Sequence, residues 1–285
     1  MKYPAGKHGM KKLIIFVLLI LFNTGLTTAQ SSDPAKPFRI GAGLGYSFTG
    51  YREETYNPIN RYLNTLTFLL DGNIEKRNFF HTFNLGFFMG DAEMKGGEQP
   101  VLTQDYDPVN GEGYYEAYLQ QYIDIRGYVE YALDYRLWGN DTFPGFLGGA
   151  FRADVYMQFA YYPSITGIIS LDLHATQKWI INPEDSLTLS IGFPVFGYAI
   201  RPAYAGADGA LIKYSSESPM KILTLGKIIS VHNYWAVFGD LKYHHTINSL
   251  LSLYSGLYFE LSRVNYPRPR IDAILRLNGG IAFTF

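Results

Sequence analysis

The sequence contains no cysteine. A chain without cysteine forms no disulfide bond and offers no thiolate to a metal ion. It also has no cysteine at which an exported protein could receive a lipid anchor. Its stability therefore depends on side-chain packing and on the hydrogen bonds of its secondary structure, and we expect neither a cofactor nor a metal site of the Cys/His type.

Long apolar runs are also missing after residue 30. A membrane-spanning helix needs roughly 20 consecutive apolar residues, and no later stretch reaches that length. If the mature protein lies in a membrane, a closed β-barrel is the structure that remains. An open sheet would leave backbone polar groups without hydrogen bonds in lipid.

The first 29 residues have the three parts of a secretory signal peptide. Four lysines precede the apolar run at 13–22, no acidic residue interrupts them, and small residues occupy 27–29, where a signal peptidase cleaves. We predict a signal peptide over residues 1–29 with cleavage near Ala29, followed by a periplasmic linker over 30–37. A retained N-terminal anchor is the alternative, but the apolar run is short for it.

Charge of either sign is scarce, at 17% of residues, whereas aromatic residues reach 16%. Residues 1–29 hold four of the 24 basic residues and none of the 25 acidic ones, so the mature chain is mildly acidic. This balance argues against nucleic acid as a partner. Aromatic residues favour strands and collect where a barrel meets the two membrane surfaces.

Alternation of apolar and polar residues with a period of two is the main secondary-structure signal from residue 38 onward. The clearest case is 270–285, where Ile271, Leu275, Leu277 and Ile281 share one face. Glycines at 41, 43 and 45 predict a crowded or curved inner face there. The segments predicted as strands are 38–49, 61–74, 79–90, 114–136, 147–162, 167–181, 186–199, 234–244, 250–262 and 270–285.

The fold class that follows is all-β, an antiparallel up-and-down transmembrane β-barrel over 38–285 with about ten strands. Eight or twelve strands stay open, because 200–233 could contain a further hairpin. The connections after odd-numbered strands are mostly the longer ones, which fits long outer loops and short periplasmic turns. A periplasmic β-sandwich or lipocalin-like barrel is the alternative, but such a protein would carry more charge on its outer face.

The C-terminal residues Ile281-Ala282-Phe283-Thr284-Phe285 resemble the closing strand of bacterial outer-membrane β-barrel proteins. The resemblance implies localisation in the outer membrane, with outer-membrane lipid as the surroundings. It also implies that Phe283 and Phe285 form an assembly signal, recognised by the barrel assembly machinery during biogenesis.

Polar residues on the faces opposite the apolar rows would point into the barrel lumen. We predict that they form a network of salt bridges that braces the barrel wall. Its members are Asp124, Arg126, Glu130, Arg152, Asp154, Asp172, His174 and Lys178.

Two histidines are weak catalytic candidates. Asp172 and His174 lie two apart on one strand, so the carboxylate could orient the imidazole as a general base. This pair is similar to half of the site of ten-stranded outer-membrane proteases, without a clear second half. His244 and Thr246 have the His-x-Ser spacing that outer-membrane lipid hydrolases place on a lipid-facing strand, with threonine instead of serine. A structural role is the favoured interpretation of both.

Three classes of function stay open on this reading. The first is a narrow, side-chain-filled barrel with a structural, binding or surface-interaction role, as expected for so small a barrel. The second is a small, porin-like solute channel. The third is an outer-membrane lipid hydrolase or protease.

Overall fold

The computed structural model describes residues 38–53, 57–76, 78–94, 100–106, 113–119, 123–159, 164–201, 224–266 and 268–285. The predicted signal peptide at 1–29 and the predicted linker at 30–37 lie outside these residues. None of the helices in the described residues is long and apolar enough to cross a membrane.

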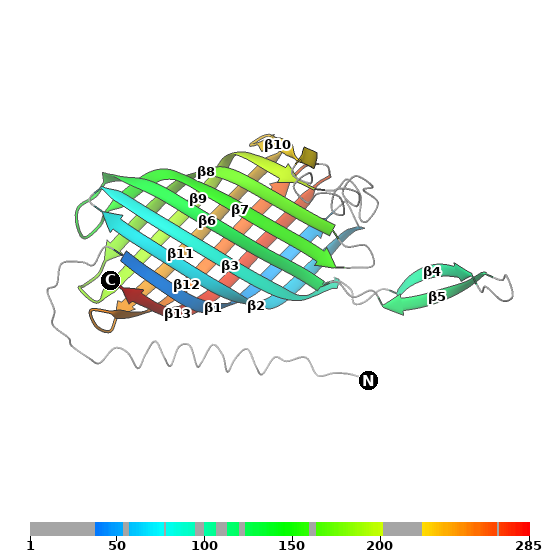
Figure 1. Ribbon diagram of the computed structural model, residues 1–285, viewed down its shortest axis with the longest axis horizontal. Helices are drawn as coiled ribbons and strands as arrows, with labels where there is room; N and C mark the ends of the chain where they lie inside the picture. The colour runs from blue at the N-terminus through cyan, green and yellow to red at the C-terminus, as the bar shows by residue number, and fades with distance from the viewer. Residues whose placement is uncertain are drawn as a thin grey trace. The chain divides into compact units, whose positions relative to one another are not determined.

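The described chain consists almost entirely of β-strands, drawn as arrows in Figure 1. Their bounds are β1 Phe38–Glu53, β2 Asn57–Lys76, β3 Phe79–Met94, β4 Pro100–Tyr106, β5 Gly113–Leu119, β6 Ile123–Trp138, β7 Gly145–Phe159, β8 Ser164–Ile180, β9 Asp185–Ile200, β10 Lys227–Ser230, β11 Tyr234–Thr246, β12 Leu251–Val264 and β13 Arg270–Thr284.

Ten of these strands form a closed antiparallel barrel. They are neighbours in chain order, β1, β2, β3, β6, β7, β8, β9, β11, β12 and β13, and β13 pairs with β1 to close the wall. The closing register runs from Arg39 opposite Thr284 to Glu53 opposite Arg270. Closure gives every strand a partner on both sides, which is what a sheet in lipid requires. The predicted ten-stranded up-and-down barrel is confirmed.

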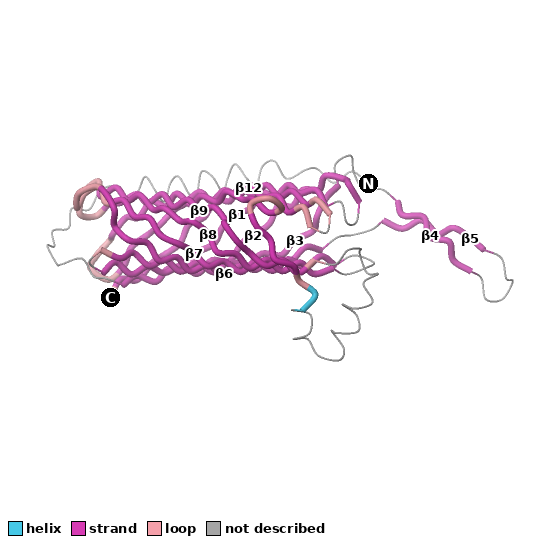
Figure 2. Tube along the Cα trace, turned by 90° about the horizontal axis from the view of Figure 1, so that it is seen from above, coloured by secondary structure: helices cyan, strands magenta, loops and turns pink. Residues whose placement is uncertain are grey.

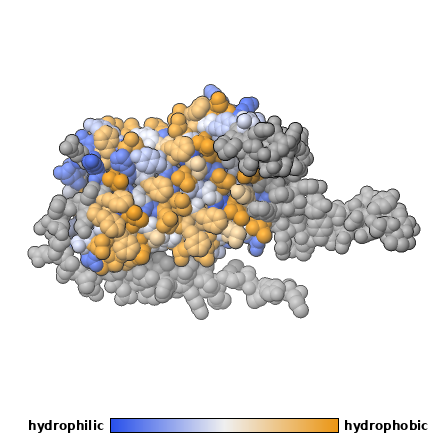
Figure 3. All heavy atoms as spheres, in the orientation of Figure 1, coloured by the Kyte–Doolittle hydropathy of each residue, from blue (hydrophilic) through white to orange (hydrophobic). Residues whose placement is uncertain are grey.

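The two faces of the wall differ in polarity. Leu44, Leu66, Phe68 and Leu171 point outward with 54–59% of their surface exposed. Figure 3 shows apolar residues across the middle of the visible face and hydrophilic ones gathered mostly toward its ends. The inward positions between them hold buried Asp, Arg, Ser, Thr and His side chains. A soluble barrel has the reverse arrangement, so this wall is built for hydrocarbon outside.

The inner face near β1 is as crowded as its glycines predict. A Cβ atom added to Gly43 would lie 2.2 Å from the hydroxyl oxygen of Tyr254 and 2.7 Å from the backbone oxygen of Gly279. Only glycine leaves room for the large side chains that cross the lumen at this level.

Short turns join the strands at the end of the barrel where β1 begins and β13 ends. Asn140, Asn182 and Asn248 each accept hydrogen bonds at Oδ1 from two backbone N–H groups two and three residues ahead, at 2.7–3.0 Å. This is the usual way in which asparagine nucleates a tight turn. Gly139 adopts a φ of 85° in the same turn as Asn140. The two longest connections, 95–122 and 201–233, lie at the opposite end. The other three connections there, 54–56, 160–163 and 265–269, are no longer than the turn 139–144, so the predicted asymmetry holds for two of the five.

One predicted strand and one predicted loop are wrong. The segment 114–136 is not a single strand, and 91–113 is not a plain loop. Instead, β3 continues to Met94, β4 and β5 pair only with each other in a two-stranded sheet, and the barrel resumes with β6 at Ile123. Alternation shows that a segment is extended, but it does not show which strand is its partner.

Strand β10 is the other feature absent from the predicted strands. It pairs with the C-terminal end of β9, from Lys227 opposite Ala199 to Ser230 opposite Phe196. The pairing of β9 with β11 begins further down, where Gly192 lies opposite Phe238. Residues 202–223, the rest of the predicted large loop, lie outside the described residues.

Candidate functional site

Two arginines and a glutamate meet in the centre of the barrel lumen. Arg126 on β6 holds Asp154 on β7 through Nε at 2.8 Å and through a second, short contact from Nη2. The same guanidinium donates to Glu260 on β12 at 2.8 and 3.0 Å. Arg152 on β7 donates to Glu260 Oε2 at 2.8 Å and to the hydroxyl of Tyr258 at 2.9 Å. We call these five residues the central cluster.

The central cluster crosses the lumen. In the order of strands around the barrel, β6 and β7 are four or five places from β12, which is the far side of a ten-stranded wall. Figure 2 shows the wall formed by the obliquely running strands. Side chains of Arg126, Arg152 and Glu260 are each at most 7% exposed. Buried charges of this kind persist only when they are paired and hydrogen-bonded.

Aromatic rings surround the guanidinium groups. Arg152 lies 4.3 Å from the ring centroid of Phe238, and Arg276 lies 4.3 Å from that of Tyr258. Arg276 also donates to the hydroxyl of Tyr128 across the lumen at 2.7 Å. Planar guanidinium groups stack on aromatic faces, so the rings fill the space between the charges as well as stabilise them.

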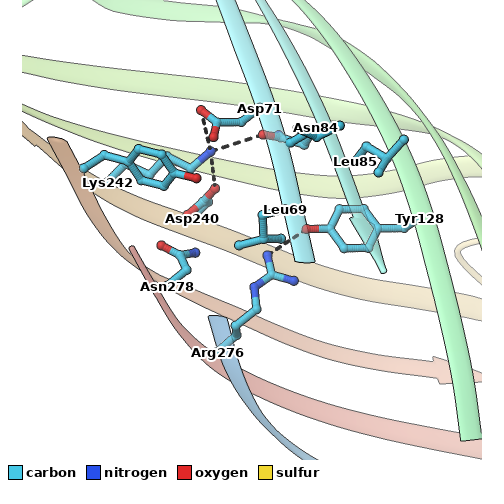
Figure 4. A pocket seen from close by; sticks show the side chains of 11 residues that line it. Leu69, Asp71, Asn84, Leu85, Tyr128, Asp240, Lys242, Arg276 and Asn278 are labelled. Carbon is cyan, nitrogen blue, oxygen red and sulfur yellow. Dashed lines mark hydrogen bonds and ion pairs between the residues drawn. The ribbon is translucent and has the colours of Figure 1, made fainter. Parts of the chain in front are cut away.

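A second group of side chains that bond to one another across the lumen lies nearer the short turns and is shown in Figure 4. We call each such group a crossing. Lys242 on β11 lies 3.1 Å from Asp240 and 3.8 Å from Asp71 on β2. It also donates to Asn84 on β3 at 3.1 Å. Lys178 on β8 and Glu75 on β2 form a further pair at 2.6 Å. The Lys242–Asp71 contact and the Lys178–Glu75 pair each join opposite parts of the wall, as the central cluster does.

A third crossing lies toward the long connections. The hydroxyl of Tyr51 donates to Asp124 at 2.5 Å, and Gln158 donates to both of them at 2.7 and 3.0 Å. Arg270 holds Asp272 through two nitrogens at 2.7–3.1 Å and stacks on Tyr156 at 3.7 Å. Side chains therefore span the lumen at three heights.

The cavities between these layers are small. One is lined by Asp71, Asn84, Lys242 and Arg276 among others, and the second by Glu130, His174, Ser190 and Tyr258 among others. Each has room for roughly one water molecule. A water there has polar partners on several sides, such as Asp71 Oδ1, which has no hydrogen-bond partner in the protein.

The eight residues predicted for the lumen network all lie on inward-facing strand positions. Arg126, Arg152, Asp154 and Glu130 meet in and around the central cluster. Lys178 bonds to Glu75, and Asp124 belongs to the crossing near the long connections. Asp172 and His174 lie nearby on β8, but the carboxylate that bonds to His174 is Asp134, whose Oδ2 is 2.7 Å from Nδ1.

The catalytic candidates are enclosed. Asp172 and His174 are 5% and 4% exposed; Asp172 lies at the middle of β8 and His174 in the half nearer the short turns. His244 is also 4% exposed and points into the lumen, where its ring lies 5.8 Å from that of Tyr254. The structure therefore does not place His244 on the lipid-facing side that a lipid hydrolase of the predicted kind uses. Among the described residues, no group of three His, Asp or Glu side chains is arranged to hold a metal ion.

Several residues of the lumen network were not among those predicted. Glu260, Tyr258 and Arg276 lie in the predicted strands 250–262 and 270–285, and Lys242 lies in 234–244. The alternation of these strands assigns all four to the inner face. Extending the alternation of inward and outward positions to the last three predicted strands identifies these four residues from the sequence.

The two phenylalanines predicted as an assembly signal lie at the seam of the barrel. Phe283 points outward from β13. The backbone N–H of Phe285 donates to the oxygen of Phe38 at 2.8 Å, and the two rings lie 6.0 Å apart. The last residue thus takes part in joining β13 to β1.

Comparison with solved structures finds barrels of the same kind. The outer-membrane protease OmpT from Escherichia coli is similar over 91% of this chain and 100% of its own, with a TM-score of 0.51 and 8% identity. The chain has the fold of a bacterial outer-membrane β-barrel protein. Weaker likenesses include an outer-membrane channel from Pseudomonas putida F1, with a TM-score of 0.40, 10% identity and coverage of 90% of this chain and 100% of that one. Another is the translocator domain of autotransporter NalP from Neisseria meningitidis, with a TM-score of 0.37, 10% identity and coverage of 99% and 98%.

At this level of identity the likeness to OmpT extends to the fold alone. No protein-family model matches the chain, and no curated protein matches it.

Proposed function

We propose that this protein is an integral outer-membrane barrel with a lumen closed by its own side chains, and that it serves a structural, binding or surface-interaction role. A signal peptide over 1–29 takes it across the inner membrane, and Phe283 and Phe285 present it to the barrel assembly machinery. The short turns then face the periplasm and the long connections face outward.

The observation that supports a closed lumen is the central cluster. Glu260 from one side of the barrel is held by Arg126 and Arg152 from the other side, at 2.8–3.0 Å. An open path would require both guanidinium groups to release the carboxylate, and Arg152 to leave the ring of Phe238 against which it packs. Buried charges persist when they are paired and hydrogen-bonded, as these three are, and this pairing supports the closed state.

A surface role is favoured by the connection between β3 and β6. It belongs to the end of the barrel that faces outward in the proposed orientation, and it contains the β4–β5 hairpin. These two strands pair with each other and with no barrel strand. A hairpin that contributes nothing to the barrel wall has a use outside it, and loops are where binding functions collect.

Conductance across a planar lipid bilayer tests the closed lumen. Purified protein inserted at neutral pH should give no steady current, and a porin measured in the same bilayers serves as the positive control. A stable ohmic current from the wild-type protein would support the solute-channel alternative and contradict the proposal.

A hydrolytic role is the weaker alternative. Asp172, His174 and His244 are enclosed by the wall and by the crossing side chains, where a lipid or peptide substrate has no access. His174→Ala and His244→Ala variants should therefore leave any hydrolysis by the protein unchanged.

A further inference from the structure

The pairing between β9 and β11 stops half-way along β9. It reaches as far as Gly192 opposite Phe238. On this side β9 is next paired at Phe196, whose partner lies on β10. Three residues of β9 therefore face seven of the opposing chain, and the described structure gives the three no register partner on this side. We call residues 193–195 and 231–237 the seam.

A proline accounts for the position of the seam. Pro194 has no backbone N–H to donate, and proline occurs in strands mainly at edges and bulges. The next residue, Val195, is skipped on the other side as well, because the register between β8 and β9 shifts between Leu171 and Asp172. Val195 thus has a register partner on neither side in the described wall. Strand pairing holds the wall less firmly here than a continuous ladder does.

The seam lies at the depth of the hydrocarbon. On β8, the neighbour of β9, Leu171 and Leu173 point outward at this height and are exposed. On β12, the neighbour of β11, exposed Leu261 lies opposite Val237. Trp235 points outward one step further toward the long connections, and tryptophan is enriched at the level of the lipid headgroups. The seam therefore begins just beneath the headgroups, beside the acyl chains.

The lumen face behind the seam is apolar. Side chains from β9, β10 and β11 share one buried cluster there, and the members nearest the seam are Ala199, Ile229, Ala236 and Phe238. Each of these four is at most 4% exposed, and we call them the apolar lining. The lining ends at Phe238, whose ring centroid lies 4.3 Å from Arg152 of the central cluster. At the seam, apolar side chains therefore face both the lipid and the lumen.

Strand β10 closes the seam in this structure, and Figure 1 labels it. The turn that follows β10 is held by two hydrogen bonds, from Asn233 N–H to the oxygen of Ser230 at 2.9 Å and from Ser230 N–H to Asn233 Oδ1 at 2.8 Å. The oxygen of Asn233 also accepts from Asn265 N–H at 2.8 Å. A strand of four residues contributes few hydrogen bonds, and such elements open before the rest of a fold does.

We propose that the wall opens sideways at the seam and that an acyl chain of the surrounding lipid enters there and packs against the apolar lining. An acyl chain suits this place because it surrounds the barrel at this depth. The seam itself contains no acidic residue, lysine or arginine that the chain would have to pass. Movement of β10 and the first residues of β11 away from β9 opens the seam, while the remaining β9–β11 pairing and the central cluster stay closed. The seam requires a barrel that lies in a bilayer.

Alkylation of single cysteines from the lipid phase provides the test. Ala236→Cys places a thiol in the apolar lining, and Ala132→Cys on β6 is the matched control, since both alanines point into the lumen and are 0% exposed. The reagent is a long-chain N-alkylmaleimide dissolved in phosphatidylcholine vesicles that contain the protein. We expect Ala236→Cys to react at least about tenfold faster than Ala132→Cys, because local opening exposes only the first position. Ile229→Cys provides a second position in the lining.

A disulfide bond across the seam provides the second measurement. Phe196 and Ser230 lie opposite each other in the register, at a separation that a disulfide can bridge. Oxidised F196C/S230C therefore holds β10 against β9, and a disulfide does not react with a maleimide. Adding this pair to Ala236→Cys should lower the rate of labelling to that of Ala132→Cys.

Equal rates for Ala236→Cys and Ala132→Cys, whether fast or slow, would overturn the proposal. So would labelling of Ala236→Cys that the disulfide leaves unchanged, because the reagent would then arrive by another route. A charged, water-soluble maleimide should label neither position. If it labels Ala236→Cys as fast as the alkyl reagent does, water and not an acyl chain enters at the seam, and the proposal fails.

The closed lumen and the seam fail separately. A steady current across a planar bilayer contradicts the closed lumen, whereas the two equal labelling rates contradict the seam. An opening that faces only lipid carries no current.

Discussion

Glu260 carries more of the lumen network than any neighbouring residue, because it is the carboxylate that both central arginines share. Replacing it by glutamine keeps its size and removes its charge, which leaves Arg126 and Arg152 buried beside Asp154 and Glu130 alone. We expect Glu260→Gln to lower the free energy of unfolding by about 3–5 kcal/mol. Urea denaturation in lipid vesicles, followed by tryptophan fluorescence, measures this loss.

The matched control is Glu75→Gln. Glu75 also bonds across the lumen, to Lys178 at 2.6 Å, but its side chain is 36% exposed. Water screens such a pair, so its loss should cost no more than about 1 kcal/mol. Equal losses in the two variants would show that burial does not set the strength of these contacts.

Asp185 gives the short turn between β8 and β9 a dependence on pH. Partial burial opposes ionisation of this carboxyl, but hydrogen bonds from Tyr243 at 2.5 Å, His245 at 2.8 Å and Asn182 at 2.7 Å outweigh it and lower its pKa. A carboxylate whose pKa is lowered by folding stabilises the fold above its unfolded pKa of about 3.9. That stabilisation is lost as the pH falls through the folded pKa.

We therefore expect Asp185→Asn to reduce the unfolding midpoint at pH 7 and to flatten the acid side of the stability curve below about pH 4. Urea midpoints measured from pH 2 to pH 7 would show both effects. An unchanged acid limb in the variant would mean that other carboxylates account for it.

The inward or outward direction of each side chain could be predicted from the sequence, because it depends on strand parity alone. On this basis Arg152, Asp154 and His174 are predicted to point into the lumen. Their partners could not be predicted in the same way. That Arg152 meets Glu260, or that His174 meets Asp134 rather than Asp172, depends on the stagger of strands that lie far apart in the sequence.

At the scale of the strands, the β4–β5 hairpin is the element whose loss the barrel should tolerate. Its residues pair only with each other, from Pro100 opposite Leu119 to Tyr106 opposite Gly113. Replacing residues 97–121 by a short Gly/Ser linker should leave the barrel folded. The free energy of closing a loop depends only weakly on its length, and the replacement removes no hydrogen bond of the barrel wall. Heat-modifiable migration and the urea midpoint should match those of the wild-type protein.

A variant of this kind that no longer folds would show that the hairpin is needed for assembly of the barrel.

The sequence did not predict the hairpin because its second strand alternates in the same way as β6, which follows three residues later. Tyrosines at 114, 115 and 118 extend the aromatic pattern of the barrel strands up to that point. The alternation of residues predicts that a segment is extended. It does not predict which other strand that segment pairs with.

For the whole molecule, the barrel could be predicted because several independent features agree. The apolar outer rows, the placement of short and long connections, and the closing strand all require the same closed wall, and β13 pairs with β1 as this requires. Whether the lumen is filled is a separate matter. A ten-stranded wall is narrow enough for side chains to meet across it, and here they do so at three heights.

The absence of cysteine allows the closed lumen to be tested directly. Ser47, Ser170 and Ser262 point into the lumen and are at most 4% exposed, and serine is nearly the size of cysteine. Each would be changed singly to cysteine in protein reconstituted into vesicles, with Asp141→Cys in an exposed turn as the positive control. The rate of reaction with a charged, water-soluble thiol reagent added on both sides is the measurement. We expect the control to react within minutes and the three lumen positions to stay unlabelled until the protein is denatured. Labelling of all three at the rate of the control would mean that water fills the barrel from end to end, which the closed lumen forbids.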